Sequence, residues 1–115
     1  MRTTLMVTDR ASIYTVSVRS KRIVLHTEVY KAYFRGHEVV RLGTHQSLPL
    51  IYLKPVGASS SQGTFSIVHR QYDGIIACQN FLRAHNYHHT DSQQYRAQWF
   101  DEVDSLVVDL SDPVS

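Results

Sequence analysis

The stretch from residue 83 to 94, RAHNYHHTDSQQ, contains the side chains of this sequence whose types and spacing best suit chemistry. His85, His88, His89 and Asp91 offer the imidazole nitrogens and carboxylate oxygens that zinc binds in proteins. Their spacing is poor for a single ion, because the adjacent His88 and His89 fall in an expected connection between two helices. The preferred interpretation of the cluster is therefore a polar linker between the two helices. A metal-dependent hydrolase that uses His85, His88 and His89 is the third functional hypothesis.

Cys78 is the one cysteine of the chain, so no internal disulfide or cysteine-only zinc site can form. A catalytic cysteine needs a histidine placed to activate it. Cys78 instead falls in the apolar stripe of an expected helix, where a free cysteine behaves as a small hydrophobe. We expect no cofactor, no membrane span and a cytoplasmic protein, since neither a signal peptide nor an apolar run of membrane length is recognisable.

Basic and aromatic residues gather on or near the outward row of the expected strands, a combination that suits single-stranded nucleic acid. Cations neutralise phosphates, and exposed rings stack on unpaired bases. Tyr30, Tyr33 and Phe34 supply the rings. Binding of single-stranded nucleic acid is therefore the alternative function. Its candidate residues are Arg19, Arg22, Lys31, Arg35 and Arg41.

Charge is divided unevenly between the two halves of the chain. Residues 1–70 hold ten Lys and Arg against three acids, a net charge of +7, and residues 71–115 hold two against seven, a net charge of −5; together they give the +2 of the whole chain. Such asymmetry marks either a polyanion-binding surface or two segments that neutralise each other in the fold.

The first seventy residues alternate apolar and polar side chains with the period of strands. In SIYTVSVRS, the residues Tyr14, Val16 and Val18 alternate with polar neighbours, and RIVLHTEVY continues the pattern. The charged RSKR between them suits a hairpin turn. PLIYLKPV and TFSIVHR predict two further strands.

Residues 27–42 fit two local structures. AYFRGHEVVRL predicts a second hairpin that turns at residues 35–37, whereas TEVYKAYFRG fits a short helix with Thr27 as N-cap and Gly36 just past its end. Tyr, Val and Phe favour strands, so we prefer the hairpin.

The last forty residues show helical periodicity. Ile75, Cys78, Phe81 and Leu82 fall on one side of a helix over residues 74–86, which begins after Asp73. A second helix is predicted over residues 92–108. Its apolar stripe is made by residues spaced four, four, three and four apart, namely Tyr95, Trp99, Val103, Leu106 and Leu110.

These elements predict a single domain over residues 1–115 of the α+β class. Four to six antiparallel strands from residues 4–70 would form a sheet, and the helices 74–86 and 92–108 would pack on one of its faces. We recognise no known family in the chain.

The leading functional hypothesis is a non-catalytic binding or interaction module. A small apolar ligand would lie between the sheet and the two helices, in contact with Tyr52, His69 and Trp99. Seven tyrosines are many for one small core, and tyrosine is common in interfaces, which favours a homodimer.

Overall fold

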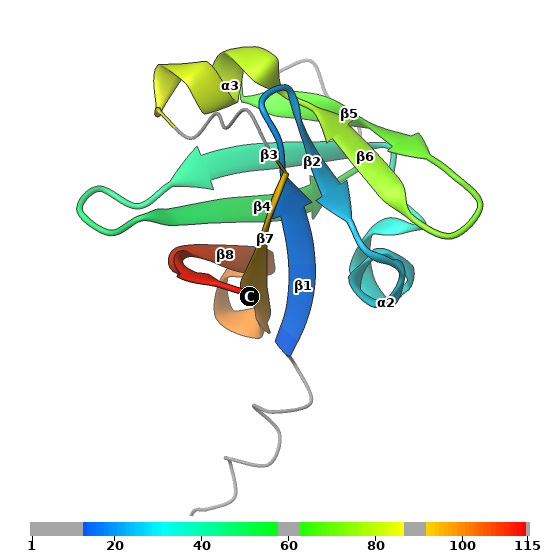
Figure 1. Cartoon of the computed structure of the whole chain (residues 1–115). Helices are drawn as coiled ribbons and strands as arrows, with labels where there is room; N and C mark the ends of the chain where they lie inside the picture. Colours follow the sequence, from blue (N-terminus) through cyan, green and yellow to red (C-terminus); the bar gives the residue numbers. More distant parts are fainter. Residues whose placement is uncertain (1–12, 58–62, 87–91, 115) are drawn as a thin grey trace, which may run out of the picture.

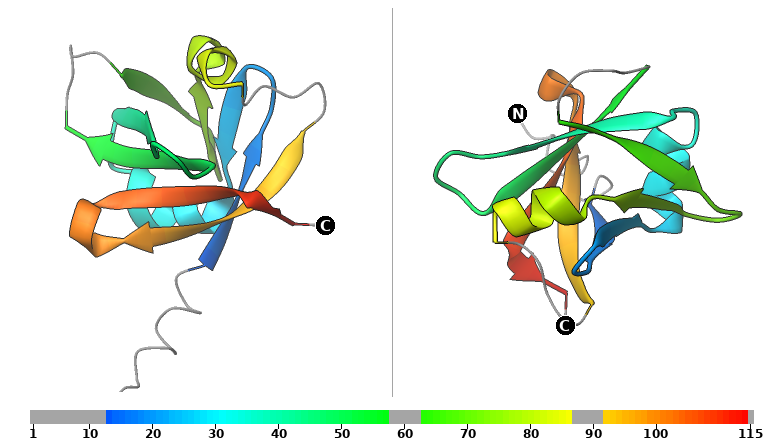
Figure 2. Two further views of the ribbon diagram at one scale, coloured as in Figure 1. Left: turned by 90° about the vertical axis from the view of Figure 1, so that its left-hand side faces the viewer. Right: turned by 90° about the horizontal axis from the view of Figure 1, so that it is seen from above.

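The described part of the chain folds into a closed antiparallel β-barrel (Figures 1 and 2). The structure, a computed structural model, describes residues 13–57, 63–86 and 92–114. Around the barrel the strands follow the order β1-β2-β6-β5-β3-β4-β8-β7, and β7 pairs with β1 to close it. The strands are β1 (Ile13–Val18), β2 (Arg22–Leu25), β3 (Val39–Thr44), β4 (Leu50–Val56), β5 (Thr64–His69), β6 (Gly74–Ala77), β7 (Gln93–Phe100) and β8 (Ser105–Pro113).

The interior of the barrel is filled by alternate residues of each strand. In β1 the buried Val16 and Val18 point inward, and in β4 Ile51 and Leu53 do the same. An eight-stranded barrel is just wide enough for side chains to fill it. The inner rows of the remaining strands complete one continuous core with Ile23, Leu25, Val40, Leu42, Ile67, Ile76, Tyr95, Ala97, Leu106 and Val108.

Two helical segments lie at opposite ends of the barrel (Figure 1). The first consists of α2 (Thr27–Val29) and the π-helical turn η1 (Tyr30–Phe34), and it buries Val29 and Phe34 at the end of β2. The second, α3 (Gln79–Ala84), follows β6, which pairs antiparallel with β2 and therefore ends beside the start of β2. This helix buries Leu82. The short 3₁₀ turn η2 (Asp101–Val103) joins β7 to β8. None of the helices in the described ranges is long and apolar enough to cross a membrane.

The predicted α+β class, with two helices packed on a sheet, is wrong. Residues 92–108 form β7, the η2 turn and the start of β8 instead of a helix. In β7 the period of two places Tyr95, Ala97 and Trp99 on the inner side, and β7 pairs with both β1 and β8. Asp104, with φ of 47°, reverses the chain in a left-handed conformation that Asp tolerates better than most residues. The apolar residues of β7 and β8, which the η2 turn separates, happen to be spaced along the sequence like those of one helix.

The helix predicted over residues 74–86 is present only in its second half. Residues 74–77 form β6 between β2 and β5, and the helix α3 spans residues 79–84. The helix begins after Cys78 rather than after Asp73. A run of apolar residues as short as Ile75–Ile76 suits a buried strand as well as a helix, and its pairing partners decide between the two.

The strands predicted in residues 12–20, 49–56 and 64–70 are present as β1, β4 and β5. The strand predicted over residues 22–30 is present only in its first part as β2, since residues 27–30 are helical, and β1 and β2 form the predicted hairpin. The hairpin preferred over residues 32–42 is wrong, because residues 27–34 are helical. The burial of Val29, Tyr30 and Phe34 against the barrel end outweighs their strand propensity. Residues 4–12 of the predicted sheet lie outside the described residues.

Candidate functional site

The three predicted ligand residues do not share one site. Trp99 points inward from β7 near the η1 end of the barrel, whereas Tyr52 lies on the outward row of β4. His69, at the end of β5, accepts or donates a hydrogen bond with the hydroxyl of Tyr30 at 2.6 Å. The pocket expected between a sheet and helices 74–86 and 92–108 cannot form in the predicted way, because residues 93–100 and 105–113 are strands.

Trp99 belongs to an aromatic cluster at this end of the barrel. Its ring lies flat on that of Tyr33, with centroids 4.0 Å apart and planes 3° apart, and Phe34 meets it edge-on at 6.4 Å. The indole N–H donates to Asp101 Oδ1 at 2.8 Å, and the edge of Tyr14 contacts Tyr33 at 5.7 Å. The indole orientation is therefore held both by stacking and by a charge-assisted hydrogen bond.

A hollow of about 350 Å³, which we call the Trp99 hollow, opens beside this stack. It is lined by Ala32, Tyr33, His37, Lys54, Pro55, Trp99 and Asp104. Its size is within the range of small-molecule sites. The lining combines flat aromatic surface with a lysine ammonium, an imidazole and one carboxylate, so it can hold a ligand that is both flat and polar.

His37, one of the residues that line this hollow, has a buried side-chain nitrogen without a partner. The residue follows η1 in a turn in which its backbone N–H donates to the carbonyl of Phe34 at 3.0 Å. Among the described residues, Nδ1 of His37 is the one buried side-chain nitrogen or oxygen that lacks a hydrogen-bond partner. Buried polar atoms are nearly always paired, since leaving one unpaired costs free energy. A ligand group in the hollow could supply the missing partner once rotation of the imidazole turns Nδ1 toward it.

The phenol of Tyr33 stays neutral at physiological pH. Burial raises the pKa of Tyr33 to about 12, and the Tyr14 hydroxyl and the Asp101 carboxylate add to the shift. A phenol with so high a pKa cannot act as a general base near neutral pH. Its contribution to the hollow is its ring surface.

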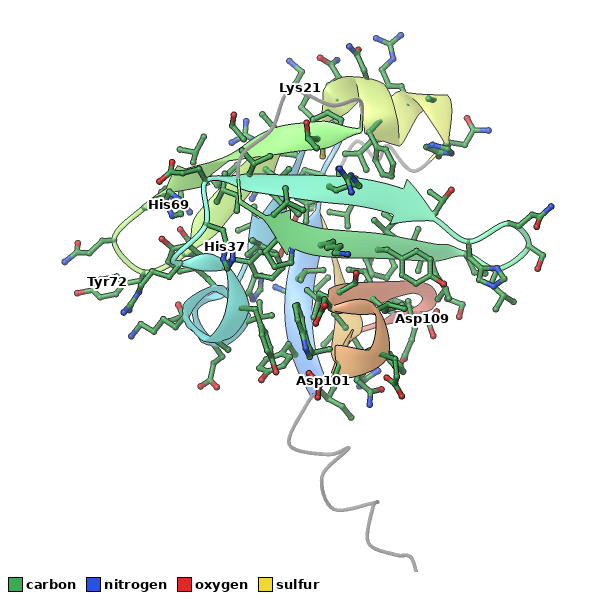
Figure 3. All side chains as sticks on the ribbon, turned by 180° about the vertical axis from the view of Figure 1, so that it is seen from behind. Lys21, His37, His69, Tyr72, Asp101 and Asp109 are labelled. Atoms are coloured by element: carbon green, nitrogen blue, oxygen red, sulfur yellow. The ribbon has the colours of Figure 1, made fainter. Side chains whose placement is uncertain are left out.

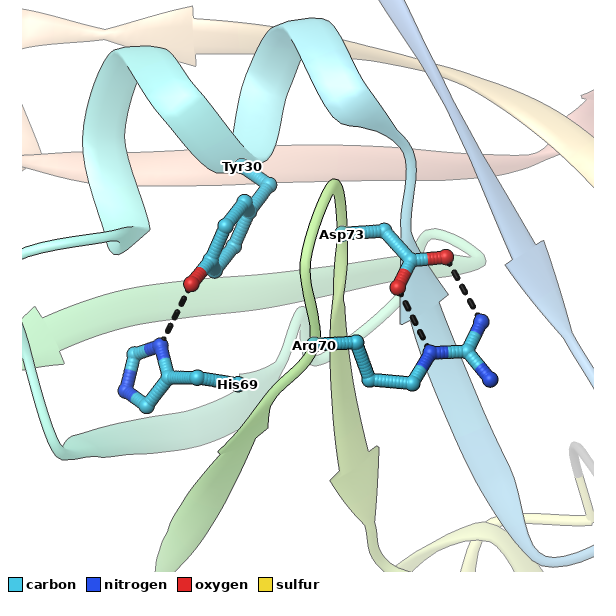
Figure 4. A network of polar contacts seen from close by, with 4 residues as sticks. All are labelled: Tyr30, His69, Arg70 and Asp73. Atoms are coloured by element: carbon cyan, nitrogen blue, oxygen red, sulfur yellow. Dashed lines mark hydrogen bonds and ion pairs between the residues drawn. The ribbon is translucent and has the colours of Figure 1, made fainter.

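A second polar group ties η1 to the β5–β6 turn (Figure 4). The hydrogen bond between Tyr30 and His69 joins η1 to the end of β5. Arg70, the next residue after His69, binds both carboxylate oxygens of Asp73 at 2.7 Å. The hydrogen bond and charge of Arg70 hold the pKa of Asp73 below its usual value. The Tyr30–His69 contact helps to position the π-helical turn, a rare element that is frequent near functional sites.

Ser17 and His26 form a hydrogen bond of 2.7 Å that resembles the first two members of a catalytic triad. Burial lowers the pKa of His26, and the negative charge of Asp73 opposes that shift. Ser17, however, lies near the end of β1 and is only 7% exposed. Both oxygens of Asp73 are held by Arg70. The pair therefore lacks an accessible nucleophile and a carboxylate free to orient the imidazole.

The structure separates the basic residues predicted to bind nucleic acid. Arg19 and Arg22 flank the β1–β2 turn near α3, whereas Lys31 and Arg35 lie in or after η1, at the opposite end of β2. Arg41 lies on the outward row of β3. Tyr30 and Phe34 are buried, so neither ring can stack on a base. Figure 3 shows the two ends of the molecule, with the basic Lys21 at the α3 end and the acidic Asp101 at the opposite end.

The predicted metal ligands are only partly described. His85 ends α3 and stacks obliquely on Phe81 at 4.8 Å, whereas His88 and His89 lie outside the described residues. Within residues 13–57, 63–86 and 92–114, no group of three histidines, cysteines or acids is arranged to hold a metal ion. Cys78 is buried, and burial raises the pKa of its thiol to about 12. The hydrolase hypothesis stays a prediction without support from these residues.

Sequence reasoning identified Trp99 but missed His37 and Lys54. These two residues come from the turn after η1 and from β4, and only closure of the barrel brings them beside β7. No local spacing signals such a site. Comparisons of this chain with protein-family models, with curated proteins and with solved structures found no match.

Proposed function

We propose that this protein is a non-catalytic binding module whose ligand is a small, planar aromatic anion held in the Trp99 hollow. The observation that carries the proposal is the buried, unpaired Nδ1 of His37, a residue that lines one hollow together with an aromatic stack and a lysine. The site differs from the apolar pocket expected from the sequence in being partly charged.

The flat wall of the hollow favours an aromatic ligand. Tyr33 and Trp99 are stacked and fixed, so their rings present surface without a further loss of side-chain entropy on binding. Pro55 adds a second rigid apolar surface. Contacts between aromatic rings contribute about 0.5–1.5 kcal/mol beyond the area they bury.

The polar groups of the hollow favour an anion. The ammonium of the exposed Lys54 attracts a carboxylate, and the imidazole of His37 can donate to one of its oxygens once its ring turns Nδ1 toward the hollow. Asp104 works in the opposite direction, because its negative charge lines the same hollow. Removing the charge of Asp104 should therefore strengthen the binding of an anion, whereas removing the charge of Lys54 should weaken it.

We infer no catalytic role for this hollow. The one phenol of the hollow, Tyr33, remains protonated, and the free thiol of the chain is buried elsewhere. We propose a cytoplasmic location as well, since a single unpaired cysteine suits a reducing compartment.

Titration calorimetry with naphthoate tests the proposal, with naphthylmethanol as the neutral probe of equal shape. We expect naphthoate to bind at least about tenfold more tightly, because one charge-assisted hydrogen bond contributes about 1.5–3 kcal/mol. Lys54→Met should remove this preference, and Asp104→Asn should strengthen naphthoate binding. Lys31→Met, which removes a lysine of η1 outside the hollow, is the matched control and should change nothing. Equal binding of both probes, or the same loss in Lys31→Met, would contradict the proposal.

Binding of single-stranded nucleic acid is a second candidate, supported by one observation. Lys21 and Arg22 line a hollow of about 520 Å³ together with Phe65 and Val68, and none of the described acids lines it. We call this the Lys21 hollow. Fluorescence anisotropy of a labelled oligothymidine should then show binding whose affinity falls as salt is added. Arg22→Gln should lower both the affinity and its salt dependence, because one phosphate contact is lost. Absence of binding at low salt would exclude this candidate.

A further inference from the structure

The outer surface of four neighbouring strands forms an apolar face on the side of the barrel away from β5 and β6. Cross-strand pairs connect Ile13 of β1 to Gln98 of β7, Gln98 to Val107 of β8, and Val107 to Tyr52 of β4. We call this surface the β7–β8 face. A hollow of about 230 Å³ lies on it, and its lining includes Ile13, Leu50, Phe100 and Val107.

Large side chains on this face are left in contact with solvent. Ile13 is 49% exposed and Phe100 40% exposed, although both line the hollow. Single exposed hydrophobic residues are ordinary, whereas a contiguous set around a hollow marks an interaction surface. The cross-strand connections make this set contiguous.

The rim of the β7–β8 face carries both signs of charge. Arg96 points outward from β7 and pairs with Asp112 of β8 at 2.6 Å, with both side chains about half exposed. Asp109 lines the same hollow, and its Oδ1 accepts hydrogen bonds from the backbone N–H and the hydroxyl of Ser111. This face therefore offers both a cation and acids to a self-complementary contact.

We propose that the β7–β8 face binds a second copy of this chain about a two-fold axis, with Arg96 of each copy facing Asp109 of the other. A two-fold interface is self-complementary and closes after two copies, so a patch with both charge signs on its rim fits it. Phe100 and Val107 would form the apolar centre, where most of the binding free energy of an interface is concentrated.

The opposite side of the barrel does not fit a second copy. Val24, Ile75 and Val68 are paired across β2, β6 and β5, and Val68 is 52% exposed. The adjoining Lys21 hollow, however, is lined by two cations and by no acid from residues 13–57, 63–86 and 92–114. Two copies joined there would place like charges together, which opposes association. This side therefore supplies a matched control for the same kind of substitution.

Sedimentation equilibrium of the full chain tests the proposal. We expect a monomer–dimer equilibrium in the micromolar range, as suits an interface of modest size. Phe100→Glu and Val107→Lys should each raise the dissociation constant at least roughly tenfold, because charge is buried at the centre of the contact. Val68→Lys should leave it unchanged within about twofold. Circular dichroism would establish that each variant keeps the fold.

Charge exchange tests the predicted contact directly. Arg96→Glu and Asp109→Arg should each weaken self-association, since each homodimer would then hold two like-charged contacts. Mixed in equal amounts, these two variants should form a heterodimer close to wild-type affinity, because both contacts become attractive again. A chain that stays monomeric at several hundred micromolar, a dimer insensitive to Phe100→Glu and Val107→Lys, or a mixture that does not associate would overturn the proposal.

Discussion

Tyr33 of η1 and Trp99 of β7 lie face to face with their ring planes 3° apart, and this contact joins the helical cover of the barrel to its C-terminal hairpin. Tyr14 of β1 and Phe34 of η1 meet the pair edge-on. The stack is therefore structural as well as part of the Trp99 hollow.

Removing the Tyr33 ring should destabilise the fold, while removing only its hydroxyl should not. We expect Tyr33→Ala to lower the free energy of unfolding by about 2–4 kcal/mol, because a large, partly buried ring is lost. Tyr33→Phe keeps the stack and should cost less than about 1 kcal/mol. Urea unfolding followed by the fluorescence of Trp99, the only tryptophan, measures both. Equal losses in the two variants would show that the ring contact contributes little.

Gly74 should not tolerate a methyl group. A Cβ at this position would lie 2.8 Å from Cδ1 of Tyr30 and 3.3 Å from Cγ2 of Ile67, so the buried ring would have to shift. We expect Gly74→Ala to destabilise the protein by about 1–3 kcal/mol, the usual cost of overpacking. Gly43→Ala is the matched strand control, since nothing lies within 4 Å of its Cβ. Thermal unfolding compares the two; a neutral Gly74→Ala would contradict the close packing of Tyr30 on β6.

His26 should make stability fall on mild acidification. Burial lowers the pKa of His26 below 6.5 in the folded state, so the unfolded chain binds the proton more readily. Its contribution is therefore lost as pH falls from about 6.5 to the lower folded pKa, and it changes no further below that value. His26→Gln, which can keep the hydrogen bond to Ser17, should flatten the urea midpoint across this range. An unchanged slope in the variant would assign the effect to other groups.

The thiol of Cys78 should be unreactive in the native protein. Its side chain is buried, and burial raises its pKa to about 12, so almost no thiolate forms near pH 8. We expect an aromatic disulfide reagent to react slowly with the folded chain and completely after unfolding in guanidinium. Rapid, complete reaction of the folded protein would contradict the burial of Cys78 at the start of α3.

The strands with clear local alternation could be predicted, and those decided by distant partners could not. In β1, Val16 and Val18 alternate with polar residues, so the pattern alone identifies the strand. Tyr95 and Trp99, by contrast, are spaced like one helical turn. Their strand is selected by pairing with β1 and β8 and by the turn at Asp104, which depends on closure of the barrel.

The candidate site follows the same division. Trp99 could be singled out as a large aromatic residue, but a sequence pattern could not place Lys54 of β4 or the turn residue His37 beside it. Their proximity results from the strand order around the barrel, in which β4 lies next to β8 and β8 next to β7. A site assembled from segments so distant in the chain has no spacing of its own.

The most direct test of the ligand site is the nitrogen chemical shift of His37, measured by long-range proton–nitrogen correlation during a titration with naphthoate. Nδ1 of His37 should shift and saturate in step with the calorimetric isotherm as it gains a hydrogen-bond partner. His45, whose Nδ1 already accepts from the backbone N–H groups of Ser47 and Leu48, should not respond. A His37 nitrogen that stays unchanged while naphthoate binds would place the ligand elsewhere and contradict the account.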